Sequence, residues 1–139
     1  MREKMHSVEV PVTVSFHDCD PMGVVWHGNY FRYFEAAREA LLRSINYSYS
    51  EMAASGYVWP VVDTHVKYRQ PLRCEETISV SATITEYENR LRIDYVVRNA
   101  AGQITTKAYT LQVAVEQASE TLCFVSPAIL LERLGVKPC

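Results

Sequence analysis

The chain has 139 residues, of which 48% are hydrophobic and 22% are charged, and its formal net charge at pH 7 is −2. This length is typical of one domain, so we expect a single domain over residues 1–139. The composition excludes a mainly disordered chain, which requires few apolar residues and a high net charge. The absence of a basic excess argues against nucleic acid as a partner, because binding to phosphate backbones depends on basic side chains.

The start of the chain and its cysteines bear on its location. Residues 1–6 are mostly charged or polar and no apolar stretch follows them, so a signal peptide is not expected. No stretch approaches the roughly 18 apolar residues of a membrane span. The cysteines are far apart in sequence and form no C-x-x-C pattern for zinc or redox chemistry. We therefore expect a cytoplasmic protein with reduced thiols. The four cysteines are Cys19, Cys74, Cys123 and Cys139.

The first predicted elements are a strand and a long helix. Apolar residues occupy every second position from Val8 to Phe16, which is the period of a strand with one buried face. A turn-like segment with proline and glycine follows. Apolar residues then recur at helical spacing, which predicts a helix from Tyr30 to Ile45 with Asn29 as its N-cap. A short helix over residues 49–55 is expected to end at Gly56.

The rest of the chain is predicted to consist mainly of strands. Short turns between successive strands favour an antiparallel sheet, and one long helix covering it gives an α+β fold. One helix covers little of such a sheet, so we expect a second copy of the chain to bury the remaining apolar surface. The predicted strands span residues 57–68, with a bulge or edge at Pro60, then 77–85, 91–97, 104–115 and 122–125, and a helix closes the chain at 127–134.

The segment between the first strand and the long helix carries the clearest chemical signal. Asp18 and Asp20 lie close to a helix N-terminus, whose free N–H groups can hold an oxyanion, and this arrangement fits a hydrolytic site. Both residues also suit a simple turn. A metal site with His17 and His27 matches no closed structural spacing. A phosphotransferase of the haloacid dehalogenase type requires Thr or Val where Met22 stands, and a parallel sheet.

A longer pattern runs from this loop into the helix. Its fixed positions are Asp18, Asp20, Gly23, Val24, Val25, Trp26, His27 and Tyr30, with Glu35 and Arg38 in the helix. The pattern resembles that of the hotdog-fold acyl-CoA thioesterases, specifically the 4-hydroxybenzoyl-CoA thioesterase-like family: Asp-x-Asp-x-x-Gly-(Val/Ile)-Val-(Tyr/Trp)-(His/Tyr)-x-x-Tyr. The resemblance implies a hotdog fold, in which an antiparallel β-sheet wraps around one long α-helix, and a homodimer or homotetramer.

The resemblance also implies roles for individual residues. Asp20 is the catalytic carboxylate, which either attacks the thioester carbonyl to give a mixed anhydride or deprotonates a water. The backbone N–H of His27 polarises the thioester carbonyl, while its imidazole either contacts substrate or has a structural partner. Gly23 lets the backbone turn tightly near the substrate. Asp18 orients the loop.

The remaining site residues are expected to bind the substrate. Basic side chains at the entrance suit the phosphates of coenzyme A, although ordinary solvated charges are the alternative for each. No metal or redox cofactor is expected, because coenzyme A is part of the substrate. The substrate-binding residues are Gly23, Val24, Trp26, Tyr30 and Glu35, and the CoA-binding residues are Lys67, Arg69 and Arg73.

The expected function is hydrolysis of acyl-CoA or aryl-CoA thioesters to a carboxylic acid and free CoA. No Gly-x-Ser-x-Gly pattern supports a serine-type thioesterase. Two alternatives stay open. The first is the same chemistry on acyl-carrier-protein thioesters in a biosynthetic pathway, and the second is a non-catalytic protein that binds acyl thioesters on the same fold.

Overall fold

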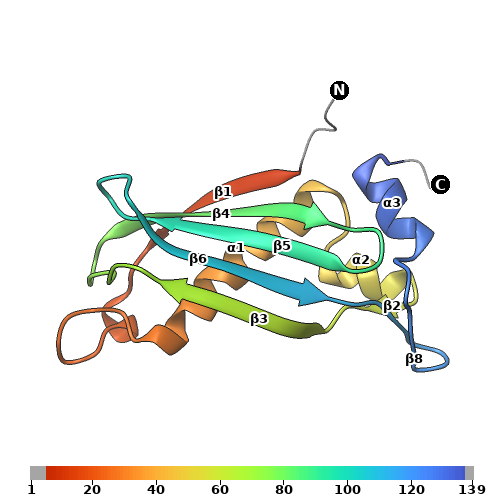
Figure 1. Ribbon diagram of the computed structural model, residues 1–139, viewed down its shortest axis with the longest axis horizontal. Helices are drawn as coiled ribbons and strands as arrows, with labels where there is room; N and C mark the ends of the chain where they lie inside the picture. Colours follow the sequence, from red (N-terminus) through yellow and green to blue (C-terminus); the bar gives the residue numbers. More distant parts are fainter. Residues whose placement is uncertain (1–5, 137–139) are drawn as a thin grey trace.

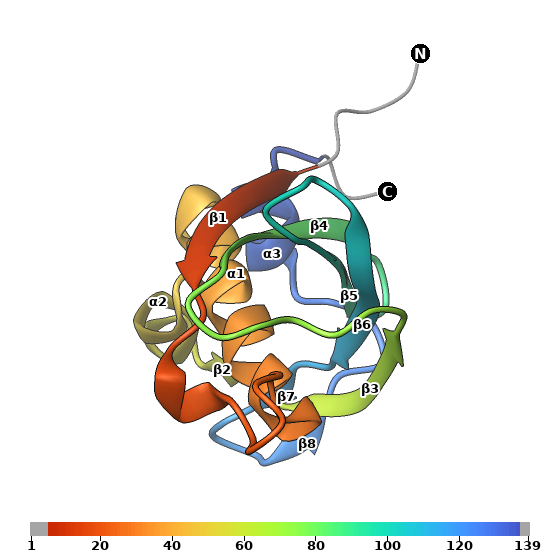
Figure 2. The ribbon, with the colours of Figure 1, turned by 90° about the vertical axis from the view of Figure 1, so that its left-hand side faces the viewer.

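A five-stranded antiparallel sheet wraps around one long helix (Figures 1 and 2). This computed structural model describes residues 6–136. Helix α1, Tyr30–Ser44, lies on the concave side of the sheet and contacts β1 and β4. The strand order is β1-β4-β5-β6-β3, which is the expected α+β arrangement. The strands are β1 Ser7–Thr13, β3 Val61–Tyr68, β4 Thr77–Glu86, β5 Leu91–Arg98 and β6 Ile104–Gln112.

The remaining elements are short. Three two-residue strands form a second antiparallel sheet in the order β2-β7-β8. Among the described residues, no helix has the length and apolar character needed to cross a membrane. The short strands are β2 Tyr57–Val58, β7 Val115–Glu116 and β8 Thr121–Leu122, and the short helices are η1 Phe16–Asp18, η2 His27–Asn29, α2 Tyr49–Ala54 and α3 Ala128–Leu134.

The core lies between α1 and the sheet. Buried and partly exposed residues alternate along β4 and β5, because successive side chains of a strand point to opposite faces. Phe34 of α1 packs its ring 5.0 Å from that of Tyr95 on β5. Burying one large apolar side chain contributes roughly 1.5–3 kcal/mol. The buried side chains of β4 and β5 therefore hold the helix against the sheet. The predicted helix agrees with α1 to within one residue at its end.

The first strand ends earlier than its alternation predicts. The strand stops at Thr13, and Phe16, expected on the buried face, is 74% exposed within η1. The cause is a capping box, in which the Ser15 hydroxyl accepts from the His17 N–H and the Asp18 carboxylate accepts from the Ser15 N–H. This local motif turns the chain away from β4 and starts the loop that holds Asp20.

Two long predicted strands are each divided in the structure. The segment 57–68 breaks at Pro60 into β2 and β3, as a proline in a strand favours. The segment 104–115 breaks after Gln112 into β6 and β7. In both cases the short piece leaves the large sheet and pairs in the small one, through Val58 with Val115.

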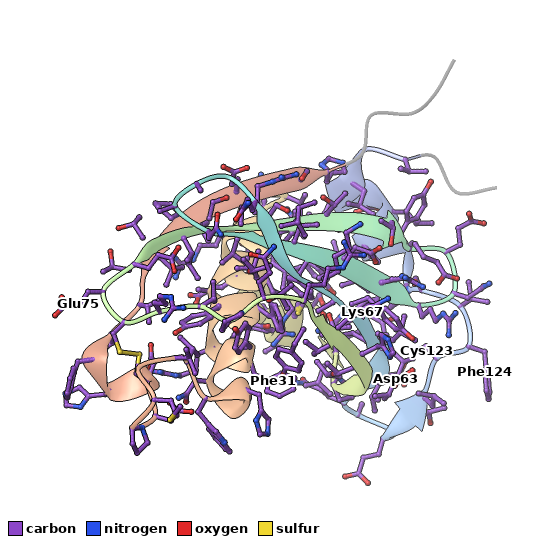
Figure 3. The ribbon with its side chains drawn as sticks, turned by 60° about the vertical axis from the view of Figure 1, so that its left-hand side comes forward. Phe31, Asp63, Lys67, Glu75, Cys123 and Phe124 are labelled. Carbon is purple, nitrogen blue, oxygen red and sulfur yellow. A yellow bond between two sulfur atoms is a disulfide. The ribbon has the colours of Figure 1, made fainter. Side chains whose placement is uncertain are left out.

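Strand β3 forms one edge of the large sheet. It pairs with β6 on one side and, at the end of the strand order, has no neighbour among the described residues on the other. Most of its side chains are exposed, including the apolar Val61, Val62 and Tyr68. Figure 3 shows the charged Asp63 and Lys67 on the same strand. An exposed edge with apolar side chains is a surface that another strand can extend.

Candidate active site

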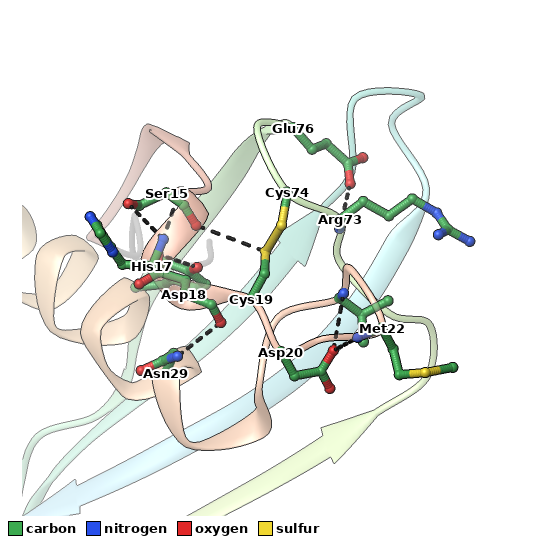
Figure 4. The surroundings of a disulfide bond; sticks show 12 residues. Ser15, His17, Asp18, Cys19, Asp20, Met22, Asn29, Arg73, Cys74 and Glu76 are labelled. Atoms are coloured by element: carbon green, nitrogen blue, oxygen red, sulfur yellow. Dashed lines mark hydrogen bonds between the residues drawn. A yellow bond between two sulfur atoms is a disulfide. The ribbon is translucent and has the colours of Figure 1, made fainter.

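Asp20 lies in a tight turn directly after η1. The Gly23 N–H donates to the Asp20 carbonyl oxygen at 2.9 Å, and Gly23 has a φ of +79°, which favours glycine. The Asp20 N–H in turn donates to the Val24 carbonyl oxygen at 2.8 Å. The Asp20 Oδ1 atom accepts from the N–H groups of Met22 at 2.9 Å and Val24 at 3.4 Å (Figure 4). The turn therefore fixes the orientation of the Asp20 carboxylate.

Asp18 connects the loop before α1 to the helices around it. Its side chain is buried, accepts from the Tyr33 hydroxyl at 2.8 Å and forms an ion pair with Arg32. Its backbone oxygen accepts from the Trp26 N–H at 3.0 Å and from the Asn29 side-chain amide at 2.9 Å. Asp18 thus links η1, η2 and α1, which agrees with its expected loop-orienting role.

Helix η2 leads directly into α1. Asn29 is the N-cap residue of α1 as predicted, but its side chain makes no capping hydrogen bond and bonds to Asp18 instead. His27 is the first residue of η2, and the N–H of a first helical residue has no acceptor within its helix. The 15-residue helix α1, whose N-terminus carries partial positive charge, begins directly after η2. The position of His27 at the start of η2 bears on its expected role as an amide donor to the substrate.

Asp20 and His27 border one cavity of about 340 Å³. This volume lies within the range of small-molecule sites. The cavity lies between residues 19–25, which we call the Asp20 loop, the start of α1 and the chain after β3. Residues distant in sequence therefore meet there. Its lining residues are Asp20, Val25, Trp26, His27, Tyr30, Tyr68, Arg69, Gln70 and Pro71.

Two tyrosines form part of the wall. Tyr30 is nearly fully buried, and burial raises its pKa although hydrogen bonds with the Leu72 backbone and Thr106 oppose the shift. Tyr68, at the end of β3, packs its ring edge-on against Tyr30 with centroids 4.9 Å apart. The Tyr68 hydroxyl donates to the His27 carbonyl oxygen at 3.0 Å. Burial also raises the pKa of Tyr68, which favours the protonated hydroxyl required of a donor.

The position of the Trp26 side chain depends on the lack of a side chain at Gly28. The Trp26 indole is 54% exposed and lies 5.0 Å from the His27 ring, measured between centroids. A Cβ atom built on Gly28 would overlap the six-membered ring of that indole. The absence of a side chain at position 28 therefore leaves the space that the cavity-lining Trp26 occupies.

The sequence-predicted residues fall into separate groups. Asp20, Trp26, His27, Tyr30 and Arg69 line the cavity together. Tyr68, Gln70 and Pro71 were missed by sequence reasoning, because only the fold brings the end of β3 to the loop. Three other predicted residues lie outside the lining: Gly23 and Val24 build the turn under Asp20, and Glu35 is exposed on α1.

The basic residues do not form one cluster. Arg69 lines the cavity with Asp20, whereas Arg73 lines a second cavity of about 430 Å³ with Gln70, Pro71, Glu76 and Asn99. Lys67 is exposed on β3 and borders neither cavity. Both cavities share Gln70 and Pro71, so they adjoin each other at this short segment.

The expectation of reduced thiols is wrong for two of the cysteines. Cys19 and Cys74 form a disulfide, although 55 residues separate them in the sequence. The fold places the segment after Leu72 against the Asp20 loop, which sequence spacing does not reveal. Cys123 is free, and Cys139 lies outside the described residues. Within residues 6–136, no three His, Cys, Asp or Glu side chains are placed to hold a metal ion.

Comparison with known proteins places the chain in a family. Residues 14–132 match the model of the thioesterase-like superfamily. YneP of Bacillus subtilis is 33% identical over 116 residues, which cover 83% of this chain and 84% of YneP. The acyl-CoA thioester hydrolase YbgC of Escherichia coli is 29% identical over 107 residues, covering 76% of this chain and 80% of YbgC.

Solved structures agree with this match. The crystal structure of the DHNA-CoA thioesterase of Staphylococcus aureus superimposes with a TM-score of 0.78 at 25% identity, covering 85% of this chain and 80% of that one. The prediction of a hotdog-fold thioester hydrolase is confirmed by these matches. The chain belongs to the thioesterase-like superfamily.

Proposed function

We propose that this chain hydrolyses acyl-CoA or aryl-CoA thioesters to a carboxylic acid and free CoA. The observation that carries the proposal is that the Asp20 carboxylate and the His27 peptide border one cavity. A carboxylate that attacks the thioester carbon or activates water, together with an amide N–H that binds the carbonyl oxygen, can carry out thioester hydrolysis. The acyl-CoA activity of YbgC supports the same substrate class.

Asp20 supplies the reacting oxygen in this proposal. Its Oδ1 atom is held by the Met22 and Val24 N–H groups, which leaves Oδ2 to face the thioester carbon. In one route Oδ2 attacks that carbon, the C–S bond breaks and CoA leaves as a thiolate, and water then hydrolyses the mixed anhydride. In the other route the carboxylate takes a proton from a water that attacks the carbonyl. Both routes give the same products.

The His27 N–H stabilises the negative charge that develops on the carbonyl oxygen. Its position at the start of η2, directly before α1, adds the partial positive charge of a helix N-terminus. The His27 imidazole is exposed beside Trp26 and takes the role of a substrate contact. The proposed reaction needs no metal or redox cofactor.

The aromatic and the basic residues are proposed to contact different parts of the substrate. Trp26, Tyr30 and Tyr68 give an apolar surface for the acyl or aryl group. Arg69 and Arg73, on the two cavities that share the chain after β3, are proposed to contact the phosphates of CoA, with Lys67 further along that edge. A carrier-protein thioester presents the same pantetheine arm, and Lys67 then faces the carrier protein.

A second copy of the chain is proposed to pair along β3. This edge strand presents the exposed Val61 and Val62, and Phe31 of α1 is also exposed. Pairing of the two edges would continue the sheet across a homodimer and bury apolar side chains. A homotetramer requires a further surface. The proposed location is the cytoplasm, where acyl-CoA thioesters are metabolised.

The test is thiol release from a panel of acyl- and aryl-CoA thioesters by wild type and by Asp20→Asn. The amide keeps the shape of the carboxylate and removes its charge, so we expect a loss of at least roughly a hundredfold in kcat. Asp94→Asn is the matched control, because Asp94 pairs with Arg92 on β5 and lines neither cavity. It should retain wild-type turnover.

The panel also separates the alternatives. Turnover by wild type that Asp20→Asn retains would overturn the assignment of Asp20. A wild-type protein that is inactive on every CoA thioester but active on an acyl-carrier-protein thioester would transfer the proposal to that substrate. Tight binding of both without turnover would make the protein a non-catalytic acyl-thioester binder.

A further inference from the structure

The Cys19–Cys74 disulfide joins a segment that borders the candidate active site to a segment that borders the neighbouring second cavity (Figure 4). The first is the Asp20 loop, residues 19–25, and the second is the Leu72–Glu76 segment. Cys19 directly precedes Asp20 in the sequence, and Cys74 directly follows Arg73, which lines the second cavity. The bond therefore attaches the chain at the residue next to the proposed catalytic carboxylate.

The two segments also contact each other through their backbones. The Val25 N–H donates to the Leu72 carbonyl oxygen at 2.8 Å, and the Cys74 N–H donates to the Gly23 carbonyl oxygen at 3.4 Å. Val24 and Arg73 form an isolated β-bridge. These contacts do not depend on the sulfur atoms, so they hold the two cysteines together when both are thiols.

The backbone spacing suits both redox states. The Cα atoms of Cys19 and Cys74 are 6.0 Å apart, within the usual range for disulfides, so the bond forms and breaks without a large backbone movement. Both residues are partly exposed, which gives a small thiol or disulfide reagent access to them. Within residues 6–136, Cys123 is free and forms no disulfide.

One peptide bond connects Cys19, and with it the disulfide, to Asp20. On the N-terminal side of Cys19, the Asp18 side chain is held by a hydrogen bond from Tyr33 and an ion pair with Arg32. Cys19 lies between Asp18 and Asp20, and its side chain is bonded covalently to Cys74. The disulfide adds a covalent constraint at the residue before Asp20, beyond the hydrogen bonds of the loop and the burial of Val25. A displacement of about 1 Å of a reacting group can lower a rate by up to two orders of magnitude.

We propose that Cys19 and Cys74 form a thiol–disulfide exchange site for low-molecular-weight thiols and disulfides, and that its oxidised form holds Asp20 in the working geometry. The effect on activity rests on the proposed function, whereas the exchange itself does not. Disulfides of proteins in reducing compartments are commonly transient and redox-sensing, which fits a bond placed beside a reacting group.

The exchange balances with a small disulfide, RSSR, as oxidant. One cysteine thiolate attacks a sulfur of RSSR, forming a mixed disulfide and releasing RS⁻. The second cysteine thiolate attacks the protein sulfur of that mixed disulfide, forming the Cys19–Cys74 bond and releasing a second RS⁻. The two protons lost by the cysteines pass through solvent to the two released thiolates. Excess RSH drives the reverse reaction.

The test uses the full chain equilibrated in glutathione buffers from fully reduced to fully oxidised. Peptide mapping by mass spectrometry measures the Cys19–Cys74 link, and hydrogen exchange measures the amides of residues 23–25 and 74. After glutathione is removed, turnover is followed by thioester absorbance, because thiol reagents would react with the cysteines. Cys123→Ser is the control, and Cys19→Ser/Cys74→Ser lacks the bond.

We expect the link to form reversibly in wild type and in Cys123→Ser. Reduction should speed amide exchange in the Asp20 loop and lower kcat roughly three- to tenfold with KM little changed, and oxidation should restore both. The double variant should stay at the reduced level in every buffer. Since wild type alone is compared between buffers, a folding defect in the variant does not affect the main result.

Other results of this experiment would contradict the exchange site, the control of Asp20 or the proposed function. Absence of the linked peptide in oxidising buffer would overturn the exchange site, even if Asp20→Asn confirms the hydrolase. Equal kcat and equal exchange in the two states would overturn the control of Asp20 by the bond. A reversible link with altered exchange, but no turnover of any thioester, would support the exchange site and contradict the proposed function.

Discussion

The Tyr68 hydroxyl donates a hydrogen bond to the His27 carbonyl oxygen across 41 residues of sequence. That oxygen also accepts from the Tyr30 N–H at the start of α1. The edge strand β3 thus holds the short helix whose first amide is the proposed donor to the thioester carbonyl. A strand at the margin of the sheet contributes in this way to the geometry of the active site.

Tyr68→Phe should lower kcat with a small change in KM. The ring keeps its packing against Tyr30, while the hydrogen bond that orients the His27 peptide is lost. One neutral hydrogen bond contributes about 0.5–1.5 kcal/mol, which corresponds to a loss of roughly two- to tenfold. Steady-state kinetics would measure it. Tyr49→Phe is the matched control, because its hydroxyl bonds to Arg38 outside the cavity lining; equal kcat in both variants would contradict the role of Tyr68.

Tyr33→Phe should destabilise the protein through Asp18. The lost hydrogen bond is buried and its acceptor is a carboxylate, so we expect the free energy of unfolding to fall by about 1.5–3 kcal/mol. Urea unfolding of Tyr33→Phe, Asp18→Asn and the double variant forms a cycle that isolates the pair. If the two single effects add without coupling, the hydrogen bond does not stabilise the loop.

Arg69→Gln should raise KM for CoA thioesters about three- to tenfold and leave kcat nearly unchanged. The expected loss is one charge contact made equally in the ground state and the transition state. The wild-type KM should also rise with salt more steeply than that of the variant, because salt screens exposed charges. Arg98→Gln, at the end of β5, is the control. A fall in kcat at constant KM would place Arg69 in the chemical step instead.

Alkaline pH should destabilise the fold through Tyr95. Burial raises the pKa of Tyr95, although Arg38 and Thr110 partly oppose the shift. In the unfolded chain the phenol ionises near pH 10.0, so the stability gained by keeping it neutral is complete below that pH and is lost as the pH rises through the folded-state pKa.

Tyr95→Phe tests this dependence because phenylalanine cannot ionise. The variant should be less stable than wild type near pH 8, since it lacks the hydrogen bond to Thr110. Its free energy of unfolding should then decline less steeply above pH 10. Chemical denaturation at several pH values would show the difference, with Tyr57→Phe as control. Parallel pH curves for wild type and Tyr95→Phe would contradict the prediction.

The sequence predicts the parts of the molecule whose signals are local. Alternation identifies β4 and β5, and helical spacing identifies α1, since one face of each is buried. Strand β3 lacks such alternation because it is an exposed edge. The exposure of Phe16 follows from Ser15 and Asp18, whose capping-box spacing is a local signal that competes with the alternation of apolar residues.

The site divides in the same way. Asp20, Trp26, His27 and Tyr30 come from one continuous stretch, so a motif can identify them. Tyr68 and the Cys19–Cys74 bond require two distant segments to meet. The meeting depends on the pairing of β3 with β6 and on the course of the chain after β3, which residue spacing does not specify.

The space above Gly28 has a consequence for how this site varies in evolution. A side chain at position 28 would take the place of the outer ring of the Trp26 indole. A relative that gains a side chain at position 28 must carry a smaller residue at position 26 or turn its indole away. Either change would remove the indole from the cavity wall, so the residue at position 28 would alter the shape of the cavity without contacting the substrate.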